Sequence, residues 1–257
     1  MKIGVYGGSF NPPHLGHVRA AQACKRALGL DCVLVIPASI PPHKQMASGS
    51  ATAMERLKLT QLAFSQLPGF EVLDMELRRE GKSYTVDTIR ALKEQYRQGE
   101  MYLMMGTDMF LSFQDWYCPE EIAKNARLVC FSRYDADAKN RESLLKQADT
   151  LEAQFGERPV LLENDCFDIS STEARRLLRF KIAAPYLPEA VLREIEAEGL
   201  YGVGENDKGL SFERLKDVSL ALLACRMPSV CAKRRGKWRK NMERMKRLPH
   251  GRAFCTM

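Results

Sequence analysis

Residues 2–17 read Lys-Ile-Gly-Val-Tyr-Gly-Gly-Ser-Phe-Asn-Pro-Pro-His-Leu-Gly-His and form the most informative stretch of the chain. The apolar run at 2–6 predicts a buried strand, and the glycines after it predict a turn that leads into a helix near Leu15. Because Gly7 and Gly8 have no Cβ, their backbone can approach an anion closely. The positive end of the helix would point to the same place, so the stretch predicts a phosphate site.

Two of the four histidines lie three residues apart in this stretch. His14 and His17 would share one face of the helix, where imidazole N–H groups can reach phosphate oxygens. The alternative is a tight strand–helix connection with incidental histidines. The Gly-x-Gly-x-x-Gly and Gly-Lys-Ser/Thr patterns of other nucleotide-binding loops are absent. The segment Pro13–His17 resembles the T/HxGH signature of the nucleotidylyltransferase superfamily.

The composition indicates a folded protein without membrane spans. A chain of 257 residues is long enough for one large domain or two small ones, and no apolar run reaches spanning length. The first residues lack an apolar export signal. The eight cysteines form no Cys-x-x-Cys pair, which predicts reduced thiols in a cytoplasmic protein rather than disulfides or a zinc site.

The charge of the chain is unevenly distributed. Residues 202–257 hold 14 Lys/Arg and 5 Asp/Glu, whereas residues 1–201 hold 25 and 27. The near-neutral body suits an enzyme of small molecules better than a nucleic-acid binder. We therefore expect one domain over 1–201, followed by a basic tail over 202–257.

Short apolar runs alternate with amphipathic stretches along the body. This alternation predicts an α/β fold, a doubly wound Rossmann-like parallel sheet with helices on both faces. Ligands of such folds bind beyond the carboxyl ends of the strands. The expected strands are 2–6, 32–36, 70–73, 102–105, 128–131 and 160–162, and the expected helices cover about 15–29, 53–67, 85–97 and 141–153.

A second motif, Ile169-Ser-Ser-Thr-Glu-Ala-Arg175, lies far downstream. Its hydroxyls precede a predicted helical turn, so helix capping is the simplest role for them. The first-turn N–H groups and the Arg175 guanidinium would add donors suited to phosphate. The string resembles the Ile-Ser-Ser-Thr-x-x-Arg motif of the same superfamily.

Intermediate segments narrow this resemblance. They are Pro41-Pro-His-Lys44, Ser83-Tyr-Thr85, Gly106-Thr-Asp108 and Trp116. Taken singly, they indicate a proline-stiffened turn, a helix start capped by Thr85, a strand end and a packing residue. Together with the two motifs, they resemble the bacterial nicotinate mononucleotide adenylyltransferases over residues 1–201.

The resemblance implies a role for each matched residue. The catalytic residues would be His14, His17 and Arg175. Nicotinate mononucleotide would be bound by Lys44, which closes over the phosphates, by Thr85, and by Trp116, whose indole stacks on the pyridine ring. The residues around ATP would be Gly7, Gly8, Ser9, Phe10, Gly106, Asp108, Ile169, Ser170, Ser171 and Thr172.

The reaction implied by the resemblance is transfer of the adenylyl group of ATP to nicotinate mononucleotide, which gives deamido-NAD and pyrophosphate. The acceptor phosphate is already ionised, so the enzyme must bring two anions together and spread charge rather than supply a base. Mg²⁺ would bridge substrate phosphates and keep most of its waters, without a protein carboxylate cage. Nicotinamide mononucleotide and phosphopantetheine are alternative acceptors. A nucleic-acid-binding protein that uses the basic tail is the alternative from another class.

The tail itself permits three hypotheses. Residues 232–240 are strongly basic, and could bind nucleic acid or an anionic surface, or form a solvated end. The third hypothesis is an out-of-frame remnant of an HD phosphohydrolase domain, entered after Phe212. Read one nucleotide back, the codons of 250–257 permit Ala-Arg-Ala-Gly-Ile-Leu-His-Asp, which looks like the His-Asp element of that domain.

Overall fold

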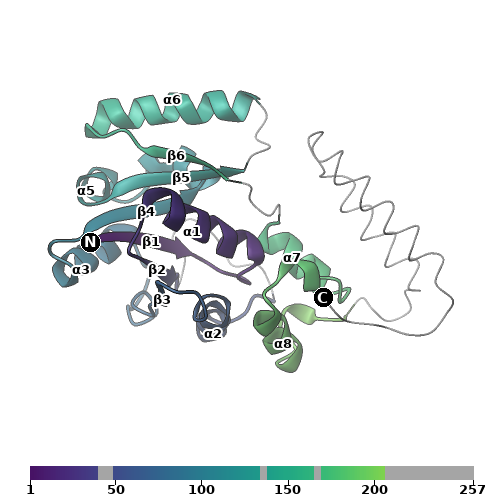
Figure 1. Cartoon of the computed structure of the whole chain (residues 1–257). Coiled ribbons are helices and arrows are strands. Elements are labelled where there is room, and N and C mark those ends of the chain that lie inside the picture. Colours follow the sequence, from purple (N-terminus) through teal and green to yellow (C-terminus); the bar gives the residue numbers. More distant parts are fainter. Residues whose placement is uncertain (40–48, 134–137, 165–168, 206–257) are drawn as a thin grey trace. The chain divides into compact units, whose positions relative to one another are not determined.

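A six-stranded, wholly parallel sheet is the central layer of the computed structural model (Figure 1). The structure describes residues 1–39, 49–133, 138–164 and 169–205. The strand order β3-β2-β1-β4-β5-β6 confirms the predicted doubly wound fold. The strands are β1 (Lys2–Gly8), β2 (Cys32–Pro37), β3 (Phe70–Val72), β4 (Glu100–Gly106), β5 (Arg127–Arg133) and β6 (Val160–Asn164).

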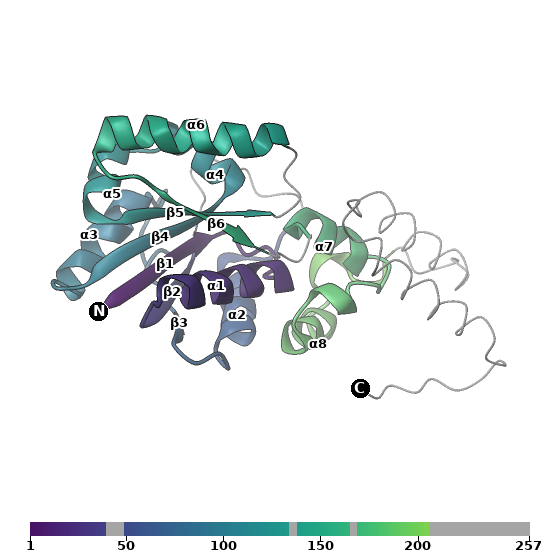
Figure 2. The same ribbon diagram turned by 45° about the horizontal axis from the view of Figure 1, so that its top comes forward.

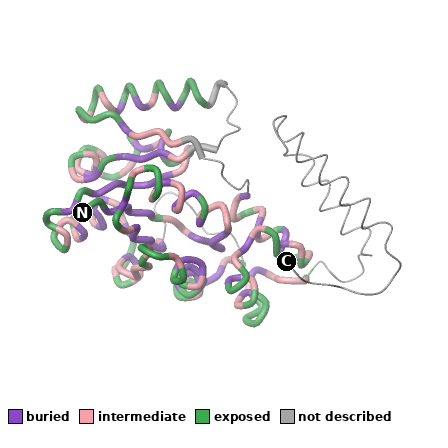
Figure 3. Tube along the Cα trace, in the orientation of Figure 1, coloured by how far each residue is buried: buried purple, intermediate pink, exposed green. Residues whose placement is uncertain are grey.

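Helices cover both faces of the sheet (Figures 1 and 2). One face packs through a single apolar cluster against α3 (Thr85–Gln95), α4 (Thr107–Leu111), α5 (Pro119–Asn125) and α6 (Ala138–Phe155). On the other face, α1 (Leu15–Leu28) and α2 (Ala53–Phe64) contact β2. The central strands are consequently buried on both sides, as the colouring in Figure 3 shows, and this explains why they are continuously apolar rather than alternating.

A small helical group follows the last strand. It consists of α7 (Ser171–Leu178), the short turns η2 (Ala184–Tyr186) and η3 (Leu200–Gly202), and α8 (Glu189–Ala197) between them. In Figures 1 and 2, α7 and α8 lie beyond the carboxyl ends of the strands. The group therefore lies at the edge where a doubly wound fold binds its ligands.

The expected strands and longer helices are confirmed, with ends that differ by a few residues. One local prediction was wrong: Gly7 and Gly8 do not form a turn but continue β1, where they pair with Ile36 and Pro37. Hydrogen bonding to β2 extends the strand through positions that turn propensity alone assigns to a loop. The prediction also missed α4 and α5, which span five and seven residues and are too short to show helical periodicity.

The sheet opens at the point where the strand order reverses. Pairing between β1 and β4 ends at Val5 and Leu103, whereas β1 stays paired with β2 as far as Gly8. β4 likewise stays paired with β5 as far as Gly106. The carboxyl ends of β1 and β4 thus separate from each other, which leaves room for a ligand between them.

The tail lies almost entirely outside the described residues. The chain divides into two units, Met1–Leu210 and Ser211–Met257, and the description ends at Glu205. The three hypotheses for the tail therefore stay predictions. In the described ranges, no helix combines the length and the apolar character that crossing a bilayer requires.

Candidate active site

The two histidines of the first motif form the start of α1. His14 is the N-cap residue, and its Nδ1 accepts the backbone N–H of His17 at 3.3 Å. The Nδ1 of His17 accepts the backbone N–H of His14 at 3.2 Å. The rings are stacked with centroids 3.6 Å apart. The pair is therefore a reciprocal capping box built from imidazoles in place of a hydroxyl and a carboxylate.

This capping determines the tautomer of both rings. Because each Nδ1 accepts a backbone hydrogen bond, the proton of the neutral imidazole resides on Nε2. Both histidines then hold an Nε2–H donor at the positive end of a fourteen-residue helix. His14 is buried at 5% exposure, and His17 is half-buried. Imidazole donors at the start of a helix are groups that can bind a phosphate, and the phosphate role stays a prediction.

The loop between β1 and α1 is held tightly by packing. Phe10 is fully buried with φ at 42°, a conformation that non-glycine residues rarely adopt. Its ring packs edge-on against Tyr6 and His17, with centroid separations of 5.4 and 5.1 Å. A Cβ on Gly8 would meet the Phe10 ring at 3.1 Å. The second glycine of the motif therefore makes room for the phenylalanine, in addition to any approach to an anion.

The second motif folds onto this same loop. Ser171 donates from Oγ to the carbonyl oxygen of Pro12 at 3.1 Å. Arg175 donates to the carbonyl oxygen of Asn11 at 2.6 Å and to Thr172 Oγ1 at 3.2 Å. The structure thus brings the two motifs together from opposite ends of the domain, with Arg175 beside the start of α1.

The capping role proposed for the hydroxyls applies to one of them. Ser170 is the N-cap of α7, and its Oγ accepts the backbone N–H of Glu173 at 3.2 Å. Thr172 is exposed, while Ile169 before the motif is buried at 1% exposure. Ile169 consequently anchors the motif by packing.

An arginine that the sequence analysis missed holds the other side of the loop. Arg56 of α2 is 2% exposed and donates to the carbonyl oxygens of Ser9, Ala38 and Ser39 at 2.7, 2.7 and 2.9 Å. These carbonyls follow the ends of β1 and β2. The residue was overlooked because an arginine in an amphipathic helix ordinarily lies in solvent.

Both arginines carry their charge in a desolvated place. Burial lowers the pKa of the Arg56 guanidinium. Burial likewise lowers the pKa of Arg175, although a guanidinium remains charged at neutral pH. Burial raises the pKa of Tyr201 in turn, so its hydroxyl stays neutral between the two arginines.

The residues predicted to lie near the ribose are at the carboxyl end of β4. Gly106 ends this strand, and Asp108 is exposed in the first turn of α4. Because β4 neighbours β1 across the opening of the sheet, both residues lie at the same end of the strands as residues 9–14, the loop between β1 and α1 that we call the histidine loop. The topology therefore permits one ligand to contact both segments.

Thr85 and Trp116, which are predicted to bind the acceptor nucleotide, lie at the start of α3 and just before α5. Thr85 is the first residue of α3 and not its cap, which is Tyr84 without a side-chain capping bond, so the capping prediction was wrong. Trp116 is half-buried, with its ring 5.4 Å from that of Phe113. The neighbouring rings of Tyr84 and Tyr117 lie 4.8 Å apart, which brings the segments of Thr85 and Trp116 together.

Helices α3 and α5 are joined by an ion pair between side chains that are also hydrogen-bonded. Arg90 of α3 pairs with Glu121 of α5, and also with Asp87 at 2.9 Å. Lys44 with its segment 41–44 lies outside the described residues.

Over the ranges that are described, no cluster of three His, Cys, Asp or Glu could hold a metal ion. The donors near the histidines are imidazole, hydroxyl and guanidinium groups, which suit phosphate rather than Mg²⁺.

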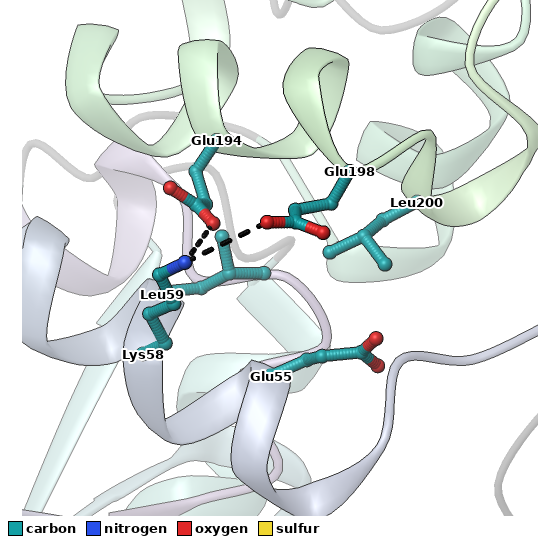
Figure 4. A pocket seen from close by; sticks show the side chains of 6 residues that line it. All are labelled: Glu55, Lys58, Leu59, Glu194, Glu198 and Leu200. Atoms are coloured by element: carbon teal, nitrogen blue, oxygen red, sulfur yellow. Dashed lines mark ion pairs between the residues drawn. The ribbon is translucent and has the colours of Figure 1, made fainter.

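A small cavity of about 140 Å³ lies between α2 and α8 (Figure 4). Lys58 pairs there with Glu194 and, at 3.7 Å, with Glu198. Glu55 turns back to its own helix and accepts the backbone N–H of Thr52 at 2.6 Å. These contacts dock α8 on α2 next to Arg56, and we assign the cavity no ligand.

Comparison with known proteins agrees with this architecture. A family model described as cytidylyltransferase-like matches residues 5–177. The probable nicotinate-nucleotide adenylyltransferase of Geobacter sulfurreducens is 40% identical over 215 residues, which cover 78% of this chain and 98% of the relative. The one of Gloeobacter violaceus is 35% identical over 204 residues, with 79% and 97% covered.

The fold also matches solved structures. The chain superimposes on Plasmodium falciparum nicotinic acid mononucleotide adenylyltransferase complexed with NaAD with a TM-score of 0.62 at 19% identity. This match covers 79% of this chain and 98% of the other, and it concerns the fold. From the family model and the curated relatives, the chain belongs to the cytidylyltransferase-like family, as one of the nicotinate-nucleotide adenylyltransferases.

Proposed function

We propose that this enzyme transfers the adenylyl group of ATP to nicotinate mononucleotide, giving deamido-NAD and pyrophosphate in NAD biosynthesis. The observation that carries the proposal is the hydrogen bond from Arg175 to the carbonyl of Asn11, which joins the second motif to the histidine loop. The names of the curated relatives and the fold of the solved adenylyltransferases support the same reaction.

In the proposed reaction, the acceptor phosphate attacks the α-phosphorus of ATP and pyrophosphate leaves. His14 and His17 would donate from Nε2 to phosphate oxygens, and Arg175 would bind the departing pyrophosphate. Thr85 and Trp116 would receive the pyridine ring. Mg²⁺ held by the phosphates and water would neutralise part of their charge. The residues thus bring two anions into line and stabilise charge, without a covalent intermediate.

Pyrophosphate release by the purified protein tests this function. The assay contains ATP, Mg²⁺ and either nicotinate or nicotinamide mononucleotide, with phosphopantetheine as a third acceptor. We expect a strong preference for nicotinate mononucleotide. A preference for either other acceptor would contradict the substrate while leaving the reaction type in place.

The nucleic-acid-binding alternative is separated by truncation. A stop after Glu205 removes the basic tail and retains the hydrogen bond from Gly204 N to the Leu178 carbonyl at 3.2 Å. An adenylyltransferase keeps its turnover after this truncation. A protein that works through the tail would lose its affinity for nucleic acid and any dependent activity. We also expect a cytoplasmic location, because the described cysteines Cys24, Cys32, Cys118 and Cys130 are free thiols.

A further inference from the structure

Arg56 holds a buried charge that no carboxylate neutralises in the part of the chain that the structure describes. Its guanidinium is 2% exposed, and its hydrogen bonds go to three backbone carbonyls. Among the described residues, its Nε finds no acceptor, and the nearby Tyr201 hydroxyl is also buried without a hydrogen-bond partner. A buried charge is normally paired with an opposite charge, because removing an ion from water costs on the order of several kcal/mol.

The neighbouring cation on the same helix behaves in the ordinary way. Lys58 is more than half exposed and pairs with Glu194 and Glu198 (Figure 4). Two positive charges on α2 thus differ: carboxylates pair with the exposed Lys58, whereas no carboxylate of the described ranges pairs with the buried Arg56. Arg56 therefore leaves net positive potential beneath the carboxyl ends of β1 and β2.

Arg56 also determines how the loop presents its backbone. The carbonyl of Ser9 points at the guanidinium, and in a trans peptide the N–H of the next residue points the opposite way. The Phe10 N–H is consequently directed away from Arg56. Since Arg175 holds the Asn11 carbonyl from α7, two arginines engage carbonyl oxygens that would otherwise repel a phosphate.

We propose that Arg56 is a positioning residue of the phosphate site, which orients the Ser9–Phe10 peptide and lends its buried charge, unpaired with any described carboxylate, to anion binding. The inference rests on the proposed function, because it assumes that the nucleotide phosphates bind at the histidine loop. Arg56 acts through the loop and the electrostatic potential, with no direct contact to the substrate required.

Pyrophosphate binding, followed by calorimetry, is the primary test because it needs no acceptor. The variants are Arg56→Met, which removes the charge, and Arg56→Lys, which keeps the charge and loses the guanidinium fork. The matched control is Lys58→Met, which removes a compensated charge from the same helix. We expect affinity to fall by at least about tenfold in Arg56→Met, about threefold in Arg56→Lys and less than about twofold in Lys58→Met.

A steady-state measurement keeps the test valid if Arg56→Met does not fold. Arg56→Lys should then raise the KM for ATP about threefold while the KM for the acceptor stays unchanged. Wild-type pyrophosphate affinity in either folded Arg56 variant would overturn the proposal and leave Arg56 with a structural role. Failure of the wild type to bind pyrophosphate would overturn it as well. Pyrophosphate binding without turnover of nicotinate mononucleotide would instead contradict the proposed function and leave the Arg56 comparison intact.

Discussion

The imidazoles of His14 and His17 are stacked at 3.6 Å, and each Nδ1 accepts the backbone N–H of the other residue. The same side chains therefore cap the start of α1 and, as neutral imidazoles, carry their proton on Nε2. This double role makes substitutions at the motif hard to interpret, because the loss of a cap and the loss of a donor coincide. Two substitutions at one position separate the two effects.

His17→Gln should separate catalysis from capping. A glutamine at this position can still accept the His14 backbone N–H, as in an ordinary capping box, but lacks the imidazole. We expect its thermal stability to stay near that of the wild type while kcat/KM falls about 10²–10³-fold. His17→Ala should lose the same activity and, in addition, about 1 kcal/mol of stability. Near-normal turnover in His17→Gln would refute the phosphate role of the ring.

Arg175→Lys should weaken ATP binding selectively. A lysine keeps the charge but cannot donate in a fork to both the Asn11 carbonyl and a phosphate. We expect the KM for ATP to rise about tenfold or more, with the KM for the acceptor within about threefold of the wild type. Arg179→Lys, at the exposed C-cap of the same helix, is the control and should change neither constant.

Trp116→Ala should act on the acceptor instead. The half-buried indole packs on Phe113, and the predicted stacking surface is lost when it is removed. The KM for nicotinate mononucleotide should rise about tenfold, as expected for loss of about 1.4 kcal/mol of aromatic contact. Trp116→Phe retains a ring and should recover most of this loss. An unchanged acceptor KM in Trp116→Ala would show that the pyridine ring binds elsewhere.

Glu76 predicts a pH dependence of stability. Its carboxyl is 7% exposed and accepts a hydrogen bond from Thr88 Oγ1 at 2.8 Å. Burial raises its pKa to about 7, against the opposing effects of Thr88 and Arg79. Because the folded pKa exceeds the unfolded value, the contribution of Glu76 is fully present below about pH 4.5 and is lost as the pH rises through 7. The loss amounts to about 3 kcal/mol.

Urea unfolding at pH 5 and pH 8 measures this effect. Glu76→Gln stays neutral at both values, so its stability should fall less than that of the wild type between them. Glu80→Gln is the matched control, since Glu80 is exposed in the same segment and should leave the wild-type difference unchanged. An identical pH difference in the wild type and in Glu76→Gln would contradict the prediction.

Local patterns along the chain were sufficient for the fold and the family. Buried strands such as Cys32–Pro37 are apolar on both faces, so they read as continuous runs, and the alternation with amphipathic helices indicates a parallel sheet. The two motifs could be identified because phosphate binding needs particular residue types at fixed local spacing. The family match confirms the resemblance drawn from the two motifs, while phosphate binding and the individual roles of the site residues remain predictions.

Contacts between distant segments were decided by packing of the whole domain. Periodicity cannot show that Arg56 is buried beneath Ser9, that Tyr201 lies with Arg56 and Arg175, or that β1 continues through Gly8. Sequence patterns report which face of a segment is apolar, but a buried guanidinium is tolerated only where other segments supply its carbonyl acceptors. Local residue patterns therefore identify the chemical groups of the site. The hydrogen-bond partners that hold those groups in place come from distant segments, which only the folded domain brings together.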